Sequence, residues 1–189
     1  MSPYETACAA VDRASAEDPQ AREGPYSLRM VDWVRRHSPS ASEELLLAAR
    51  AQHVRRWTVP RSTYPEGRAG YLRWREDLKK FHADVLAAIL KEAGYGDASV
   101  AKARSLLVRK NLASDAEGQT LEDAACLVFL QFEFAEFAAK TEAGKTVEII
   151  RKTWKKMSPA ARREALGLPL PPDQLSLVKR ALENPAAGG

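Results

Sequence analysis

Apolar side chains recur every three to four residues in nearly every segment of this chain, and this spacing most constrains what it can fold into. A period near 3.6 places apolar residues on one face of a helix, whereas a half-buried strand needs strict alternation. Prolines, glycines and polar capping residues separate the periodic segments. We therefore expect an all-α fold: a single-domain helical bundle of about eight to nine helices.

The interruptions give the approximate bounds of each expected helix. A third helix begins at the capping-box sequence Ser40–Glu43 and reaches His53, and a short helix opens at Ser158–Pro159. A long loop is expected over residues 58–70, and long ordered loops often bind ligands. The other helices are expected at about residues 3–16, 26–37, 71–93, 98–110, 119–140, 143–156 and 172–183. One domain should cover residues 1–183, and the tail, residues 184–189, should be disordered.

Composition indicates a cytoplasmic protein with a sizeable core. Hydrophobic residues make up 45% of the 189 residues, yet no apolar run approaches the roughly 18 residues that a membrane span needs. No apolar segment of the kind found in secretory signals follows the N-terminus. Cys8 and Cys126 lie among apolar neighbours, so we expect buried, reduced thiols. These features predict no membrane partner.

A cationic stretch rich in aromatic residues follows the third expected helix. Between Arg55 and Lys80, basic residues far outnumber acidic ones, although the whole chain has a net charge of only +4. That net charge is too small to indicate nucleic acid by itself. Guanidinium groups bind phosphate or carboxylate, and tyrosine rings can stack on a base. The predicted anion-binding residues are Arg50, Arg55, Arg56, Arg61, Tyr64 and Tyr71.

The arginines nearest His53 leave an alternative open. Arg50 and Arg56 each lie about one helical turn from His53, so both could flank its imidazole. Both could equally form ion pairs with carboxylates of the chain. The carboxylates considered as partners are Glu43, Glu44, Glu122 and Glu133.

Three polar residues stand on helical faces that are otherwise apolar: His53, His82 and Asp123. A buried carboxylate costs several kcal/mol unless it is paired or bound to a metal. If the three helices pack together, these groups could act as acid and base, or could bind one divalent metal such as Mn, Fe or Zn. The alternative is a hydrogen-bonded network that specifies the core.

Several segments closely resemble an uncharacterised family, domain of unknown function 4202. The resemblance extends from about Tyr4 to about Leu182 and implies no established activity. The segments that support it are residues 49–57, 60–65, 68–75, 121–130 and 151–158.

A more distant resemblance is to the HD superfamily of metal-dependent phosphohydrolases, which are all-α proteins. Ala51–Val54 resembles the first element of the HD motif and would place His53 on a metal-binding histidine of that family. Leu121–Ala124 resembles the second element and would place Asp123 on its final aspartate. This resemblance implies an HD-domain-like fold, a divalent metal and hydrolysis of phosphorylated compounds.

The chain departs from the HD pattern at two ligand positions. Val54 stands where that family has aspartate, and no histidine lies near Ser27, where an earlier ligand would fall. A metal site of this kind would have to use His82, which resembles a further histidine of many members.

Three classes of function therefore remain open. The first is a divergent HD-like hydrolase that acts on a phosphorylated small molecule or nucleotide. The second is a non-catalytic nucleotide- or RNA-binding module with a degenerate HD site. The third is a structural or protein-interaction domain without a small-molecule ligand.

Overall fold

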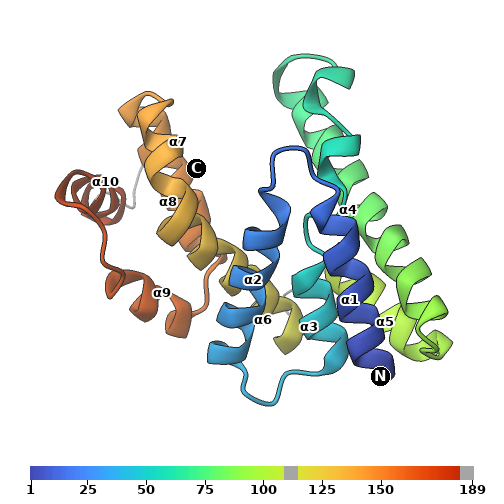
Figure 1. Cartoon of the computed structure of the whole chain (residues 1–189). Helices are drawn as coiled ribbons and strands as arrows, with labels where there is room; N and C mark the ends of the chain where they lie inside the picture. The colour runs from blue at the N-terminus through green and yellow to red at the C-terminus, as the bar shows by residue number, and fades with distance from the viewer. Residues whose placement is uncertain (109–114, 184–189) are drawn as a thin grey trace. The chain divides into compact units, whose positions relative to one another are not determined.

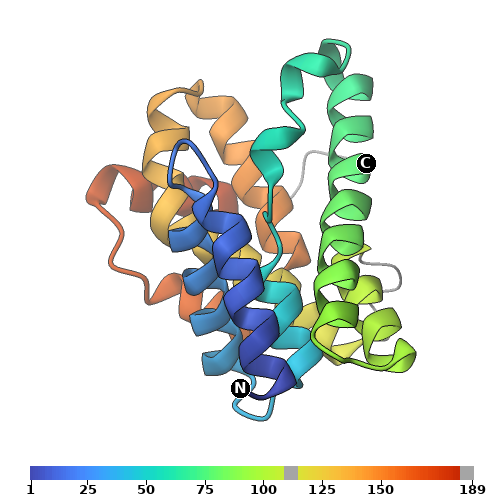
Figure 2. The same cartoon turned by 45° about the vertical axis from the view of Figure 1, so that its right-hand side comes forward.

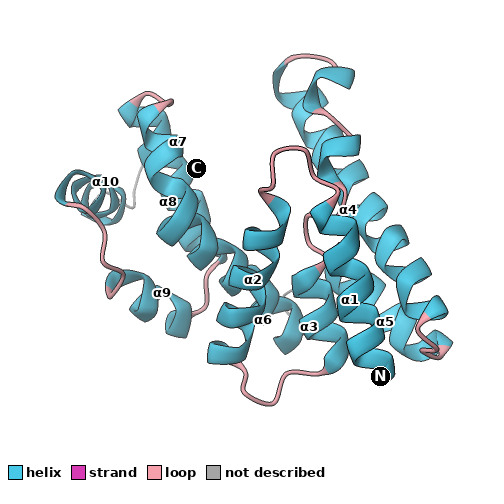
Figure 3. Cartoon of the chain, in the orientation of Figure 1, coloured by secondary structure: helices cyan, strands magenta, loops and turns pink. Residues whose placement is uncertain are grey.

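The computed structural model describes residues 1–108 and 115–183, and the expected tail at 184–189 lies outside these residues. Within the described ranges the chain is helical and has no strand, which confirms the all-α prediction (Figures 1 and 3). These ranges contain ten α-helices, slightly more than expected. They are α1 (Pro3–Ala16), α2 (Glu23–His37), α3 (Glu43–Arg50), α4 (Gly67–Glu92), α5 (Asp97–Val108), α6 (Ala116–Val128), α7 (Phe134–Ala139), α8 (Ala143–Lys156), α9 (Pro159–Leu166) and α10 (Pro172–Glu183).

The chain divides into two compact units, residues 1–121 and 122–189, with the boundary inside α6. The first unit contains α1 to α5, and the second contains α7 to α10. The prediction of one domain over residues 1–183 stays a prediction. None of the described helices is long and apolar enough to cross a membrane.

In the first unit, α3 packs against both α2 and α5, and α5 packs against α4. The inward residues of α3, among them Leu45 and Leu47, have no exposed surface. Gly94 has a positive φ of 91° and separates α4 from α5, as expected of a glycine that ends a helix. The N-terminal half of α4 extends past the ends of α1 and α3 (Figures 1 and 2).

The third helix is shorter than the sequence predicted at both ends. Ser42, rather than Ser40, is its N-cap, because Ser42 Oγ accepts the backbone N–H of Leu45 at 3.2 Å. The helix ends at Arg50, and residues 51–55 form turns. Arg55 has a φ of +53°, a left-handed conformation that cannot continue a helix. His53 therefore lies in a turn and is partly exposed, not on a buried helical stripe.

The connection between α3 and α4 begins and ends earlier than the loop predicted at residues 58–70. It contains two 3₁₀ turns, η1 (Arg56–Thr58) and η2 (Arg61–Thr63), and α4 begins at Gly67 instead of residue 71. Along α4, His82 is buried, as its position on an apolar helical face predicted. Trp74 is also buried, and Tyr71 is exposed.

The sixth expected helix is interrupted in the structure. A π-helical turn at Phe129–Glu133 separates α6 from α7. In the second unit, Phe134 packs in a core with residues of α8 and α10, including Ile150 and Val178. The predicted bounds of α1, α8 and α10 are confirmed. Both cysteines are free thiols, of which Cys126 is buried and Cys8 partly buried.

Candidate functional site

His53 lies against an aromatic ring and a guanidinium group in the first unit. Its ring stacks on that of Tyr26, with centroids 3.8 Å apart and planes 12° apart. Nη1 of Arg56 lies 2.9 Å from Nε2 of His53. Because a guanidinium group has donors only, His53 Nε2 accepts this hydrogen bond and carries no proton. The imidazole is thus neutral, and a cation covers its accepting nitrogen.

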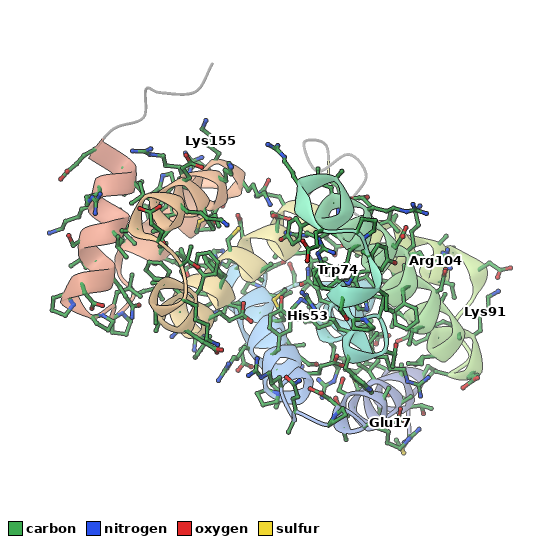
Figure 4. The ribbon with its side chains drawn as sticks, turned by 90° about the horizontal axis from the view of Figure 1, so that it is seen from above. Glu17, His53, Trp74, Lys91, Arg104 and Lys155 are labelled. Carbon is green, nitrogen blue, oxygen red and sulfur yellow. The ribbon has the colours of Figure 1, made fainter. Side chains whose placement is uncertain are left out.

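The ring of Trp74 holds the guanidinium group of Arg56 in place. The guanidinium carbon of Arg56 lies 4.9 Å from the centroid of the Trp74 ring, which is cation–π geometry. The indole Nε1 of Trp74 donates to the carbonyl of Val59 at 2.9 Å, so the ring cannot rotate freely. Figure 4 labels His53 and Trp74, the two residues whose rings the Arg56 guanidinium contacts.

His82 lies next to this pair and is buried. Its ring centroid is 6.3 Å from that of His53, so the structure brings these two predicted residues together. Burial lowers the pKa of His82 to about 4; the charge of Arg56 acts in the same direction, and the bond to Val54 opposes it. At neutral pH the ring is therefore neutral. Its Nδ1 donates to the carbonyl of Val54 at 2.8 Å, because that carbonyl can only accept.

Glu23 is a buried carboxyl group that lies just ahead of the helix expected at about residues 26–37. It is the first residue of α2, and its Oε2 accepts the backbone N–H of Arg55 at 2.9 Å. Burial raises the pKa of Glu23 to about 7, although the backbone N–H groups of residues 55–57 act in the opposite direction. An acidic residue just ahead of Gly24-Pro25 is typical of a first helical turn, and this signal could have identified it. Glu23 holds the turn that carries Arg56.

Glu23 and His82 should have opposite effects on the pH dependence of stability. The pKa of Glu23 is raised, so its contribution is present below about pH 4.5 and is lost as the pH rises through about 7. The pKa of His82 is lowered, so its contribution is present above about pH 6.5 and is lost as the pH falls through about 4. Between about pH 4.5 and pH 6.5 both contributions change with pH, and in the parent protein these opposite changes largely cancel.

We expect the Glu23→Gln variant to lose stability relative to the parent as the pH falls from 6.5 to 4.5. The expected slope is up to about 1.4 kcal/mol per pH unit, because His82 then acts without its opposing group. Urea unfolding at several pH values measures it. The His82→Gln variant should show the reverse slope, and identical profiles for parent and both variants would contradict the assignment.

The side chains of Arg50 and Arg55 form ion pairs with carboxylates elsewhere in the first unit. Arg50 donates Nε and Nη2 to the two carboxylate oxygens of Asp12, each at 2.7 Å. The side chain of Arg55 pairs with Glu17 at 3.1 Å. Arg50 thus follows the ion-pair alternative, with a partner in α1 that the sequence did not indicate.

Arg61, Tyr64 and Tyr71 have local partners around the loop. Arg61 donates to three backbone carbonyls of its own segment, those of residues 64, 65 and 67. The hydroxyl of Tyr64 donates to Asp77 at 3.1 Å. Tyr71 has 42% of its surface exposed and lies beside Arg75. Of the six residues predicted to bind an anion, Arg56 contacts His53 directly.

Asp123 belongs to the second unit, where it is buried. Its Oδ1 accepts the backbone N–H of Ser158 at 2.8 Å, and Ser158 Oγ in turn accepts the N–H of Ala161 at 3.2 Å. This chain of bonds fixes the start of α9. The prediction that Asp123 shares a site with His53 and His82 stays a prediction.

The divalent metal predicted at His53, His82 and Asp123 stays a prediction. Among residues 1–108 and 115–183, no group of three or more His, Cys, Asp and Glu side chains is arranged to bind a metal ion. The guanidinium of Arg56 also occupies Nε2 of His53, and its charge would repel a cation there. A fixed cation beside neutral imidazoles is instead suited to an anion.

Comparison with known families gives a match over most of the chain. The model of an uncharacterised family, described as "Domain of unknown function (DUF4202)", matches residues 5–178. This match agrees with the resemblance of the sequence motifs, and its description names no activity. No curated protein and no solved structure matches the chain. The more distant likeness to the HD superfamily finds no support in these comparisons.

Proposed function

This chain belongs to the DUF4202 family, and because that description gives no activity, we propose from the geometry that it binds a phosphorylated small molecule, such as a nucleotide. The proposed site is the Arg56–His53 pair. One observation supports this proposal most directly: the guanidinium of Arg56 contacts both the ring of Trp74 and the imidazole of His53.

The chemistry of Arg56 matches a phosphate group. A planar guanidinium can donate two parallel hydrogen bonds to phosphate oxygens. Trp74 orders the side chain beforehand, so less conformational entropy is lost when a ligand binds. The bond to His53 joins a cation to a neutral acceptor, so this contact does not cancel the charge. That charge reaches the neighbouring imidazole, because Arg56 contributes to the lowered pKa of His82.

A second candidate function is hydrolysis of the bound compound. The neutral state of His53 favours it, because Nε2 can take a proton once Arg56 turns towards a phosphate. His53 would then act as general base on an attacking water. His82 and Asp123 are the further acid–base or metal-binding residues proposed from the sequence. A divalent metal, Mn, Fe or Zn, is the cofactor that the HD resemblance implies.

The test is a thermal shift titration with inorganic phosphate and with nucleoside mono-, di- and triphosphates. We expect at least one compound to raise Tm by several degrees through preferential binding to the folded state. The Arg56→Gln variant should bind that compound at least tenfold more weakly, because a charge-assisted hydrogen bond contributes about 1.5–3 kcal/mol. The parent and variant are compared at equal protein concentration.

Arg104→Gln is a matched control. Arg104 of α5 pairs with Asp84 of α4, and its substitution should have no effect on the titration. Phosphate release measured with and without manganese, iron or zinc separates binding from hydrolysis and tests for the metal. A ligand that binds the Arg56→Gln variant as well as the parent would refute the proposed site. If none of these compounds shifts Tm, the structural or protein-interaction alternative is favoured.

A further inference from the structure

The N-terminal half of α4 presents a second cationic surface, which we call the α4 face: Arg68, Tyr71, Leu72, Arg73 and Arg75. All five residues are exposed. Residues 67–80 contain five basic and two acidic side chains. Figures 1 and 2 both show this part of α4 extending past the ends of α1 and α3. The face is thus accessible within the first unit and carries an excess of positive charge.

Tyr71 gives the α4 face an exposed aromatic ring. It has 42% of its surface exposed, and its neighbour Leu72 has 50%. The guanidinium carbon of Arg75 lies 5.9 Å from the Tyr71 ring centroid, and Nη1 of Arg75 donates to the Tyr71 hydroxyl at 3.4 Å. On its other side, Tyr71 contacts the buried ring of Trp74, with centroids 5.9 Å apart. The ring is therefore supported from within the helix and flanked by a cation.

The charge of the α4 face is only partly compensated. Arg68 has no ion pair or hydrogen bond within the part of the chain that the structure describes. Arg73, whose side chain is 76% exposed, reaches Asp77 only at 4.0 Å. An exposed ion pair of this kind is weak, so Arg73 can exchange Asp77 for a phosphate, and Arg68 can bind one without breaking an ion pair.

We propose that the α4 face binds single-stranded nucleic acid. Aromatic side chains on a cationic surface stack with unpaired bases while arginines contact the backbone phosphates. A duplex hides the faces of its bases, so only a single strand could stack on Tyr71. An acidic protein could bind through the positive charges and Leu72 alone. The exposed aromatic ring at position 71 therefore favours nucleic acid over an acidic protein. This inference does not depend on the proposed small-molecule site.

The experiment is fluorescence anisotropy of a labelled twelve-nucleotide oligouridine RNA with the full chain. If the RNA makes three phosphate contacts, raising the salt concentration from 50 to 200 mM should weaken binding about twentyfold. Tyr71→Ala should weaken binding about tenfold through lost stacking, whereas Tyr71→Phe should bind like the parent. Arg68→Ser should reduce the dependence on salt, and Arg104→Ser, which changes a surface arginine of α5, should leave binding unchanged.

The same measurements contain the results that would overturn the proposal. RNA binding that survives Tyr71→Ala unchanged would exclude stacking at this face. Oligothymidine in place of the RNA distinguishes a surface that accepts any single strand from one that requires the 2′-hydroxyl, and either result supports the proposal. Polyglutamate that binds as tightly as RNA, with no effect of Tyr71→Ala, would show that the face recognises acidic protein. Because Tyr71 is exposed, circular dichroism should confirm that its variants fold.

Discussion

Replacing Trp74 with alanine is expected to lower the free energy of unfolding by about 4 kcal/mol. The indole is 8% exposed, so its removal leaves a large cavity beneath the 56–66 loop. The substitution also removes the hydrogen bond from Nε1 to the carbonyl of Val59 and the ring on which Arg56 rests. Loss of stability and loss of the proposed phosphate site should therefore occur together.

Urea unfolding measures the stability change, and limited trypsin digestion measures loosening of the loop. Trypsin should cut after Arg61 faster in the Trp74→Ala variant. Trp74→Phe keeps most of the apolar bulk but leaves the Val59 carbonyl without its donor, so it should cost about 1–2 kcal/mol. Trp57→Ala is the control, because Trp57 is partly exposed and should lose less than Trp74→Ala. Equal losses at both tryptophans would show that Trp74 does not anchor the loop.

Gly70→Ala is the second substitution with a large expected effect, a loss of about 3 kcal/mol. A Cβ atom at this position would lie 1.9 Å from the carbonyl oxygen of Pro65. The position of the Cβ atom is fixed by the backbone of α4, and the oxygen belongs to the backbone of the preceding loop. The two segments must therefore move apart. The Pro65 carbonyl also accepts a hydrogen bond from Arg61 at 2.8 Å, which the movement would disturb. Helix propensity alone predicts the opposite sign, because alanine is favoured over glycine by about 1 kcal/mol.

Gly24→Ala is the matched control for this substitution. Gly24 also lies in a helix, α2, but a Cβ there would meet nothing within 4 Å. We expect this variant to be unchanged or more stable by about 0.5–1 kcal/mol. Urea unfolding of both variants decides the matter. If both glycine variants gain stability, then the close approach of Gly70 to Pro65 is not a feature of the folded protein.

The sequence predicted some features of the proposed site and missed others. The spacing of His53 and Arg56 left two alternatives open for Arg56, contact with His53 or an ion pair with a carboxylate. In the structure the two side chains form a hydrogen bond, in a turn and not on a helix. The apolar helical face that contains His82 predicted its burial correctly. The role of Glu23 was missed, because its contact with Arg55 joins residues 32 positions apart.

By itself, the sequence determined that this chain is all-α and where α1, α8 and α10 begin and end. Those properties depend on apolar periodicity, capping residues and proline or glycine interruptions, all of which act over a few residues. Only the tertiary structure decided that α3 stops at Arg50, that Arg50 pairs with Asp12, and that Tyr71 is exposed. These outcomes depend on which helices pack together, because the free energy of burying a side chain is set by neighbours distant in sequence.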